Sequence, residues 1–394
     1  MYSLAKADSS SYSRTTLTHK LTQLSTTKYS QTTIQDLRQI VQNPMQTAKN
    51  WDVILPSKNF LDKLSKNNII DPNADQNDFI ICLAYGGKNH SRFFDNLESD
   101  NPSRDTFFKT TETDGIDWVL YQIINNRLYK IKTILSCKPG SQAIFTGSIF
   151  DHAGDAFALV TIAFSKQKLI RDNGDLIPLQ KQYLYKLLES GNFEMCKRRN
   201  GTKIESKPYC NKPFDWRDPN PVLSFISKPD DTIYFVGCGS DKNNKPCISN
   251  GKIIFSEGNN QIIRKLQPTT NLPDILFENQ PLKTKYLECP QKIILTKSEV
   301  LLCSAGLDYN GTILHLMVGY IKNKWSERWQ LINGTGIIKT NYPLGFGLYA
   351  AKYKIINNEL VAIGWNSGPT GLPHSQSPYL SVRINEDLGT VELG

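Results

Sequence analysis

The sequence predicts an all-β protein: a head of antiparallel sheets arranged like the blades of a β-propeller, preceded by a short helical segment. From Trp51 onward the chain alternates short apolar runs with clusters of Asn, Asp, Gly and Pro, which is typical of strands joined by turns. Three segments, 230–237, 297–304 and 357–364, each begin with a polar turn that leads into an apolar run, at a spacing of roughly 60 residues. The composition, 39% hydrophobic and 21% charged, is that of a folded globular protein.

Residues 1–50 are predicted to be a polar helical segment, and residues 51–394 the head. The first segment is rich in Ser, Thr and Gln, and its apolar residues have heptad spacing with one change of phase: Leu17, Leu21, Leu24, then Ile34, Leu37 and Val41. We expect an interrupted stalk that ends before Pro44 and joins copies of the chain into a homo-oligomer. A single amphipathic helix lying on the head fits the pattern equally well.

The head contains enough apolar runs for an all-β fold. The expected strands are 79–84, 118–124, 128–135, 143–149, 156–164, 232–237, 252–256, 292–296, 300–305, 312–321, 329–332, 349–355, 360–365 and 379–384. The stretch 178–188 fits either a helix or a strand. Radially repeated sheets bury their edges, which favours a propeller, and a pair of packed sheets is the alternative.

Eight cysteines without a C-x-x-C pair argue against a zinc or thioredoxin-like site. Most of them fall into sequence neighbours that bracket short segments, as disulfides of extracellular β proteins do. The expected bridges are Cys196–Cys210, Cys238–Cys247, Cys289–Cys303 and, with less support from spacing, Cys82–Cys137. Eight thiols in a reducing compartment are the alternative.

Glycosylation sequons agree with an extracellular location. They begin at Asn89, Asn200, Asn310 and Asn333, and three of them read Asn-Gly-Thr, which is typical of exposed turns. The chain has no apolar stretch long enough for a signal peptide or a membrane span, so we expect any membrane anchor to lie outside this sequence.

The net charge of +9 suits an approach to anionic cell surfaces. The basic residues are dispersed, and no helix-turn-helix or zinc-finger motif accompanies them, so a nucleic-acid partner is not expected. Motifs for nucleotide binding, zinc hydrolysis, calcium loops and the serine nucleophile elbow are also absent. We therefore expect no cofactor and no metal.

Two residual groups of polar residues could carry chemistry, although turns explain them as well. Asp151, His152 and Asp155 form the first, and the stretches 308–312 and 386–390, which faintly resemble sialidase Asp-box turns, form the second. Asp and Asn before Gly are what tight turns require.

The segment 231–238 with Cys247, the block from Cys289 to Cys303 and the polar N-terminus together resemble the attachment glycoproteins of paramyxoviruses. The resemblance implies a stalked oligomer on the virion or in the extracellular space, with six-bladed propeller heads that bind a host receptor or glycan, as a hemagglutinin does. The Asn-Arg-Lys-Ser-Cys-Ser string of the sialidase-active members is missing, and Glu288 stands just before Cys289 instead.

We therefore expect a non-enzymatic attachment protein, with a secreted sialidase-like glycoside hydrolase or a bacterial propeller effector as the alternative. Aromatic and Pro-bounded loops of the C-terminal third are the expected binding surface, because such loops commonly form recognition sites. The candidate receptor-binding residues are Trp365, Pro373, His374, Ser375, Gln376 and Tyr379.

Overall fold

A computed structural model of the chain describes a five-bladed β-propeller. The described residues are 50–85, 116–124, 127–136, 142–170, 176–197, 200–201, 203–204, 216–225, 232–240, 246–255, 261–268, 272–326, 328–338, 348–367, 373–377 and 379–394. They form five predominantly antiparallel sheets, which confirms the all-β propeller prediction. The predicted stalk, 1–50, lies outside them except for Asn50.

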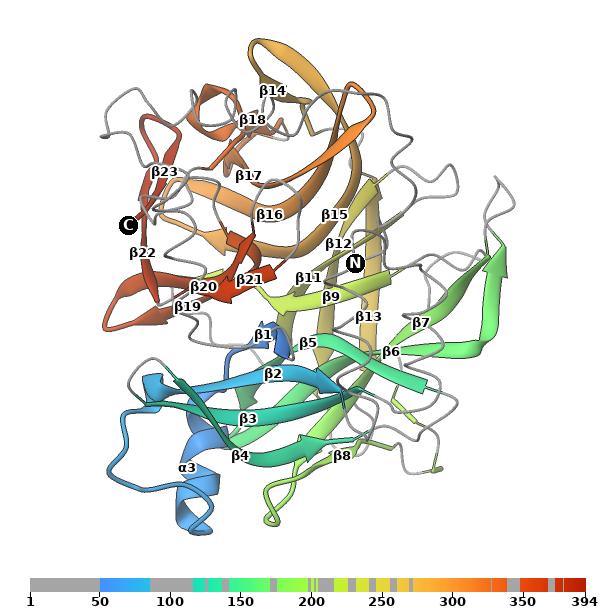
Figure 1. Cartoon of the computed structure of the whole chain (residues 1–394), viewed down its shortest axis with the longest axis vertical. Helices are drawn as coiled ribbons and strands as arrows, with labels where there is room; N and C mark the ends of the chain where they lie inside the picture. The colour runs from blue at the N-terminus through green and yellow to red at the C-terminus, as the bar shows by residue number, and fades with distance from the viewer. Residues whose placement is uncertain are drawn as a thin grey trace.

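The blades follow one another along the chain (Figure 1). Blade 1 is β1 (Asn50–Ile54), β2 (Phe79–Tyr85), β3 (Ile116–Ile124) and β4 (Arg127–Leu135). Blade 2 is β5 (Gln142–His152), β6 (Asp155–Ile170), β7 (Leu176–Leu187) and β8 (Phe193–Met195). Blade 3 is β9 (Trp216–Pro221), β11 (Thr232–Ser240), β12 (Pro246–Ile254) and β13 (Gln261–Pro268).

Blade 4 is the largest sheet, with β10 (Leu223–Ser224), β14 (Ile275–Phe277), β15 (Gln280–Ile294), β16 (Ser298–Tyr309), β17 (Thr312–Asn323) and β18 (Gln330–Leu331). Blade 5 is β19 (Leu348–Ile356), β20 (Glu359–Ser367), β21 (Pro373–Gln376), β22 (Leu380–Asn385) and β23 (Thr390–Leu393). Two short 3-10 helices, η1 (Gln76–Asp78) and η3 (Ile332–Gly334), lie in connections.

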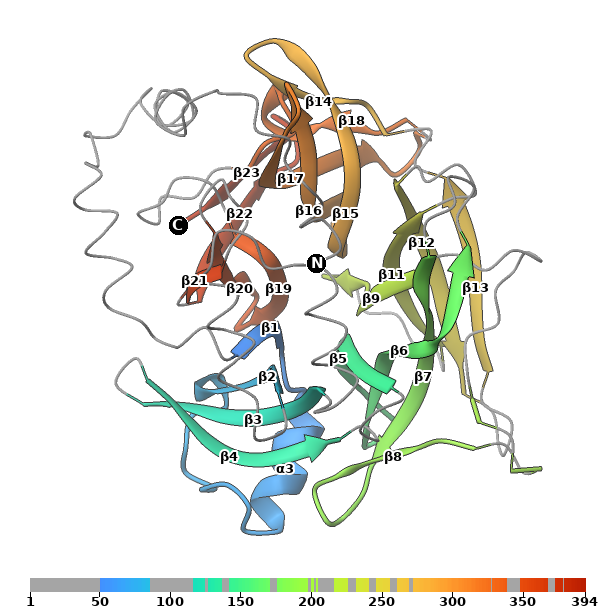
Figure 2. The same cartoon turned by 45° about the vertical axis from the view of Figure 1, so that its right-hand side comes forward.

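The innermost strands β1, β5, β9, β15 and β19 surround a common centre (Figure 2), and each contacts the next. β1 also contacts β19, so the first and last blades close the ring directly. An apolar cluster that contains Val53, Ile80 and Ile363 fills the joint between these two blades. Each blade thus covers a face of its neighbour, and the apolar core is distributed between blades.

Helix α3 (Lys58–Lys66) connects β1 to β2 and was not expected from the sequence. Its apolar residues Phe60, Leu61 and Leu64 lie on one face and are buried in the core of blades 1 and 2. Phe60 stacks on Phe193, with ring centroids 5.7 Å apart. The helix therefore covers the end of these two blades, below β4 in Figure 1.

The ambiguous stretch 178–188 is a strand, because Leu176–Leu187 forms β7 and pairs with β6 over most of its length. Alternate side chains such as Tyr183 and Tyr185 are buried against one neighbouring blade, and Leu184 against the other. Burial on both faces gives the strand its nearly continuous apolar sequence, which resembles that of a buried helix.

Candidate functional site

Every innermost strand carries a β-bulge where it passes the centre of the ring. The extra residues are Asp52 in β1, 145–146 in β5, 218–219 in β9, 289–290 in β15 and 350–351 in β19. A bulge bends its strand and changes the direction of the neighbouring side chains. The repetition in all five blades indicates that the centre is built to present particular residues.

The bulge backbone is strained at three positions. Asp218, Cys289 and Ala350 have φ values of 55°, 47° and 52°, in the left-handed region that costs non-glycine residues about 1–3 kcal/mol each. Pro219 and Pro290 follow two of them, and a proline cannot donate to the sheet ladder. Strain of this kind, repeated at one level of the molecule, is typical of a functional site.

Two buried carboxylates from adjacent blades share one arginine at this level. Arg217 and Asp218 follow one another in β9, and Glu288 comes from β15; all three are less than 9% exposed. The Arg217 guanidinium lies 3.3 Å from Glu288 Oε1, and its Nε lies 3.7 Å from Asp218 Oδ2. The hydroxyl of Tyr349, from β19, donates a hydrogen bond to Glu288 Oε2. Three blades thus contribute to one polar cluster, which we call the central acidic cluster.

The carboxylate of Asp218 is held from blades 3 and 4 together. The backbone N–H of Cys289 donates to Asp218 Oδ2 over 3.0 Å, and the Cys238 thiol donates to the same oxygen over 3.4 Å. Burial, and then the charge of Asp218, raises the pKa of Cys238, so this thiol stays protonated and remains a donor.

An imidazole lies beside the central acidic cluster on the face of blade 4 that meets blade 5. His315 accepts or donates a hydrogen bond with the Tyr286 hydroxyl, 2.8 Å from Nδ1, and its ring meets Tyr349 edge-on at 5.8 Å. Burial lowers the pKa of His315 to about 4, against the opposing charge of Glu288, so the ring is neutral at pH 7. A Cβ on Gly306 would lie 2.2 Å from the Tyr286 ring, so only glycine lets Tyr286 reach across β16.

A second polar layer ties the inner strands together next to the central acidic cluster. The buried Lys352 donates from Nζ to Asn220 Oδ1 over 2.7 Å, which links β19 to β9. The Asn220 amide donates in turn to the carbonyl of Pro290, and Gln291 donates to the carbonyl of Pro221. Since these bonds replace the ladder bonds lost at the prolines, they hold the bulged strands in place.

The central acidic cluster combines the carboxylates of Asp218 and Glu288 with the guanidinium of Arg217, and the buried ammonium of Lys352 lies in the adjacent polar layer. Buried charged groups are costly, and they commonly occur at functional sites. In the described part of the chain no three His, Cys, Asp or Glu side chains are arranged to hold a metal ion. The arrangement can accept a proton and stabilise developing positive charge.

The predicted receptor-binding residues do not form a projecting loop. Pro373–Gln376 is strand β21, which pairs with β20 at Trp365. Tyr379 packs against the joint of blades 1 and 5, with Lys354 Nζ 5.2 Å above its ring, and burial raises the pKa of its hydroxyl. These positions therefore belong to blade 5 or pack against it.

Two predicted disulfides are not formed, for reasons of sheet geometry. In the β11–β12 pair Cys238 lies opposite Ile248 and not opposite Cys247, so the two side chains lie on opposite faces of blade 3. Cys238 is a thiol that contacts the central acidic cluster. Cys289 lies in the bulge opposite Cys303, but the two side chains pack in different apolar clusters and are not bridged. Proximity along the sequence alone did not align either pair for a disulfide.

The remaining cysteine predictions involve residues outside the described ranges. Cys196 is half-buried, and burial raises the pKa of its thiol to about 11; Cys210 lies outside the described residues, so the Cys196–Cys210 bridge stays a prediction. Cys82 is buried in blade 1, while Cys137 lies outside the described residues, and that bridge stays a prediction.

The sequons have different surroundings. Asn200 and Asn310 are in exposed turns, and Asn89 is outside the described residues. Asn333 is half-buried, and its amide donates to the carbonyls of Ile337 and Val391, each over 3.1 Å. A glycan on that nitrogen would disrupt the contact between η3 and β23, so Asn333 is a structural residue here.

The other polar candidates have turn and contact roles. Asp151 and His152 end β5 and Asp155 begins β6, around a turn in which Asp155 forms an ion pair with Lys186 at 2.6 Å. The Asp308 carboxylate accepts from the backbone of Gly311 within its turn. Glu386 accepts from Ser298 and from the backbone of Lys297, and so connects blade 5 to blade 4.

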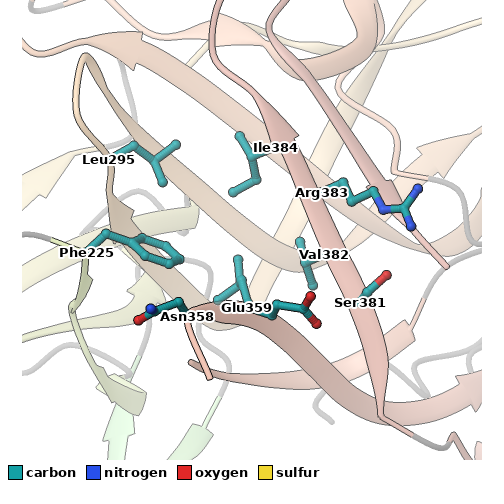
Figure 3. A pocket seen from close by; sticks show the side chains of 9 residues that line it. Phe225, Leu295, Asn358, Glu359, Ser381, Val382, Arg383 and Ile384 are labelled. Atoms are coloured by element: carbon teal, nitrogen blue, oxygen red, sulfur yellow. The ribbon is translucent and has the colours of Figure 1, made fainter. Parts of the chain in front are cut away.

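A separate pocket of about 330 Å³ lies between blades 4 and 5 (Figure 3). Leu295, Val382 and Ile384 form its apolar part, with Phe225 beside them and Arg383 directed outward. It lies near the ends of β10 and β15 and in contact with β22, so it shares no residue with the central acidic cluster.

The sequence contains a signal for the central acidic cluster that our sequence analysis did not use, namely a carboxylate close to a proline. Asp218-Pro219 and Glu288-Cys289-Pro290 place an acidic residue directly before or near a proline inside apolar segments. Proline in a strand marks a bulge or an edge, and a bulge next to a carboxylate is a candidate site. Neither place lies in an expected strand, and strand β9 was not expected at all.

Comparison with known proteins supports the fold. No protein-family model matches the chain, and no curated protein sequence matches it significantly. Among solved structures, the GH32 beta-fructofuranosidase BmSUC1 of Bombyx mori superposes with a TM-score of 0.50 and 13% identity, over 97% of this chain and 70% of that one. An exo-1,5-alpha-L-arabinanase from a bovine ruminal metagenomic library gives 0.46 and 11% identity, over 88% and 98%.

These comparisons correct the predicted resemblance to paramyxovirus attachment glycoproteins. The ring has five blades rather than the expected six, and the similar structures are propeller glycoside hydrolases. The prediction of a non-enzymatic, hemagglutinin-like attachment head was therefore wrong. No helix in the described ranges is long and apolar enough to cross a membrane.

Proposed function

We propose that the chain is a glycoside hydrolase whose reaction centre is the central acidic cluster. The observation that carries the proposal is the pair Asp218 and Glu288, buried on bulged strands of adjacent blades around Arg217. Glycosidases use two carboxyl groups on either side of the scissile bond and pass through a positively charged, oxocarbenium-like transition state. The two buried carboxylates of the cluster suit that transition state.

The proposal assigns proton transfer and charge stabilisation to Glu288 and Asp218, which come from the bulged strands β15 and β9. The shared fold with a beta-fructofuranosidase supports furanosides as the first substrates to test.

The test is a hydrolysis assay on β-fructofuranosides and on aryl furanosides and pyranosides. We expect Glu288→Gln and Asp218→Asn to lower kcat by about 10²–10⁴-fold while the melting temperature stays close to that of the native protein. The control is Glu299→Gln, because Glu299 is also a paired carboxylate of blade 4, in contact with Lys292 and Lys322, and it lies outside the cluster.

The proposal is wrong if the intact protein hydrolyses no member of the panel, or if the cluster variants hydrolyse it as fast as the Glu299 variant.

A further inference from the structure

The thiol of Cys238 makes an unusual contact for a buried cysteine. Its sulfur lies 3.4 Å from Asp218 Oδ2, its shorter acceptor distance, and 3.8 Å from the Arg217 carbonyl oxygen. The sulfur is fully buried on β11, opposite Arg217 and next to the bulge of β9. Most buried cysteines act as small apolar residues. This one faces a carboxylate in the middle of the molecule.

The backbone around Cys238 is arranged so that this contact can form. Gly237 is the single residue opposite the two bulge residues of β9, and a Cβ there would lie 3.1 Å from the carbonyl oxygen of Arg217. The absence of a side chain at Gly237 allows β9 to approach β11 closely. The approach brings Asp218 within reach of the thiol of the next residue.

The two carboxylate oxygens of Asp218 have different partners. Oδ2 receives the Cys238 S–H and the Cys289 N–H, and the Arg217 Nε is 3.7 Å away. No described residue donates to Oδ1. Two donors on one oxygen fix the rotation of the carboxylate group and leave the other oxygen for a ligand.

We propose that Cys238 is a positioning residue, whose S–H···O hydrogen bond fixes the Asp218 carboxylate so that Oδ1 is the oxygen that meets the substrate. This inference rests on the proposed function for its effect on turnover. The hydrogen bond itself does not depend on it. A protonated thiol is suited to the role because it donates a hydrogen bond without adding positive charge next to Arg217.

The first test uses the infrared S–H stretching band of the intact protein, which needs no substrate. A thiol that donates to a carboxylate absorbs at lower wavenumber than a thiol in an apolar environment. We expect Cys238→Ala to remove a band on the low-wavenumber side, and Cys303→Ala to remove one at the apolar position. Cys303 is the matched control because it is equally buried and burial alone raises its pKa.

The second test is turnover on a substrate found with the panel above. We expect Cys238→Ala to lower kcat about five- to tenfold with little change in KM, Cys238→Ser to restore most of it, and Cys303→Ala to leave it unchanged. If Cys238→Ala does not fold, Cys238→Ser is measured in its place, because its hydroxyl can donate to Asp218.

The inference is overturned if the Cys238 band lies at the apolar position, or if Cys238→Ala turns over like the native protein. Equal losses in the Cys238→Ala and Cys303→Ala variants would indicate a packing role and would also overturn it. A missing substrate would contradict the proposed function alone, because the infrared band reports the hydrogen bond without turnover.

Discussion

Single residues determine which side chains can reach the centre of the ring. Tyr286 crosses β16 to His315 only because position 306 is glycine, and Asp218 reaches Cys238 because position 237 is glycine. These glycines have ordinary negative φ values, so space rather than backbone conformation selects them. Small residues opposite a bulge are therefore part of the site although they carry no functional group.

The neutral state of His315 predicts a specific pH dependence of stability. Its pKa is about 4 in the folded protein, because of burial, and about 6.5 in an unfolded chain. Between these values the unfolded state binds the proton and the folded state does not, so the free energy of unfolding falls as the pH decreases from 6.5 to 4. The loss is up to about 3 kcal/mol.

The measurement is urea unfolding at pH 7, 5.5 and 4.5 for the native protein and for His315→Gln. The glutamine variant should lose less stability across this range than the native protein does. Tyr286→Phe keeps the imidazole and should keep the native slope. Parallel curves for the native and glutamine forms would contradict a buried neutral His315.

At the scale of elements, the short helix α3 packs into the apolar core shared by blades 1 and 2. Phe60 is fully buried and stacked on Phe193 of β8, so the helix joins two blades that its own chain position does not connect. Phe60→Ala should lower the free energy of unfolding by about 3–5 kcal/mol, because it leaves a cavity that the surrounding strands cannot fill.

Lys58→Ala is the control for this prediction. Lys58 lies in the same helix and is exposed, so its replacement should change the free energy of unfolding by no more than about 0.5 kcal/mol. Both variants are compared by urea unfolding at pH 7. A loss below 1 kcal/mol in Phe60→Ala would mean that the helix does not support the two blades.

The strands that were predicted from the sequence have uninterrupted apolar runs, and the strands that were missed do not. Outer and middle strands such as β2, β16, β17 and β20 have uninterrupted apolar runs, and they were expected nearly in place. Strand β9 and most of β15 were missed because prolines and charged residues interrupt them. Those interruptions are the bulges and buried charges of the candidate site, so the pattern fails where the chain departs from a regular sheet for function.

The sequence also did not predict which side chains contact one another across strands and blades. Hairpin neighbours such as Cys238 and Cys247 are close along the chain, yet a one-residue difference in register places their side chains on opposite faces. The same limit applied to Asp218 and Glu288, which come from different blades and meet only through the ring.

The whole ring is held by apolar joints and central polar bonds. Apolar clusters lie between successive blades, and Lys352 joins the strands β19 and β9 across the centre. A chain of this size buries about three quarters of its unfolded surface, so its stability does not require cross-links. The predicted dependence on disulfides can therefore be tested on the intact protein.

We expect the melting temperature to change by less than about 2 °C when a strong reductant is added, which corresponds to under about 1 kcal/mol for a domain of this size. A structural disulfide typically contributes 2–4 kcal/mol and would shift it by more than that. The physical reason is that Cys238 faces Asp218 and lies on the opposite face of blade 3 from Cys247, so these two cysteines are not aligned for a bridge. Peptide mapping without reduction serves as the control, because it would detect a Cys82–Cys137 bridge. A large change in melting temperature on reduction, without such a bridge, would contradict the prediction, because it would show a cross-link that the blade geometry does not allow.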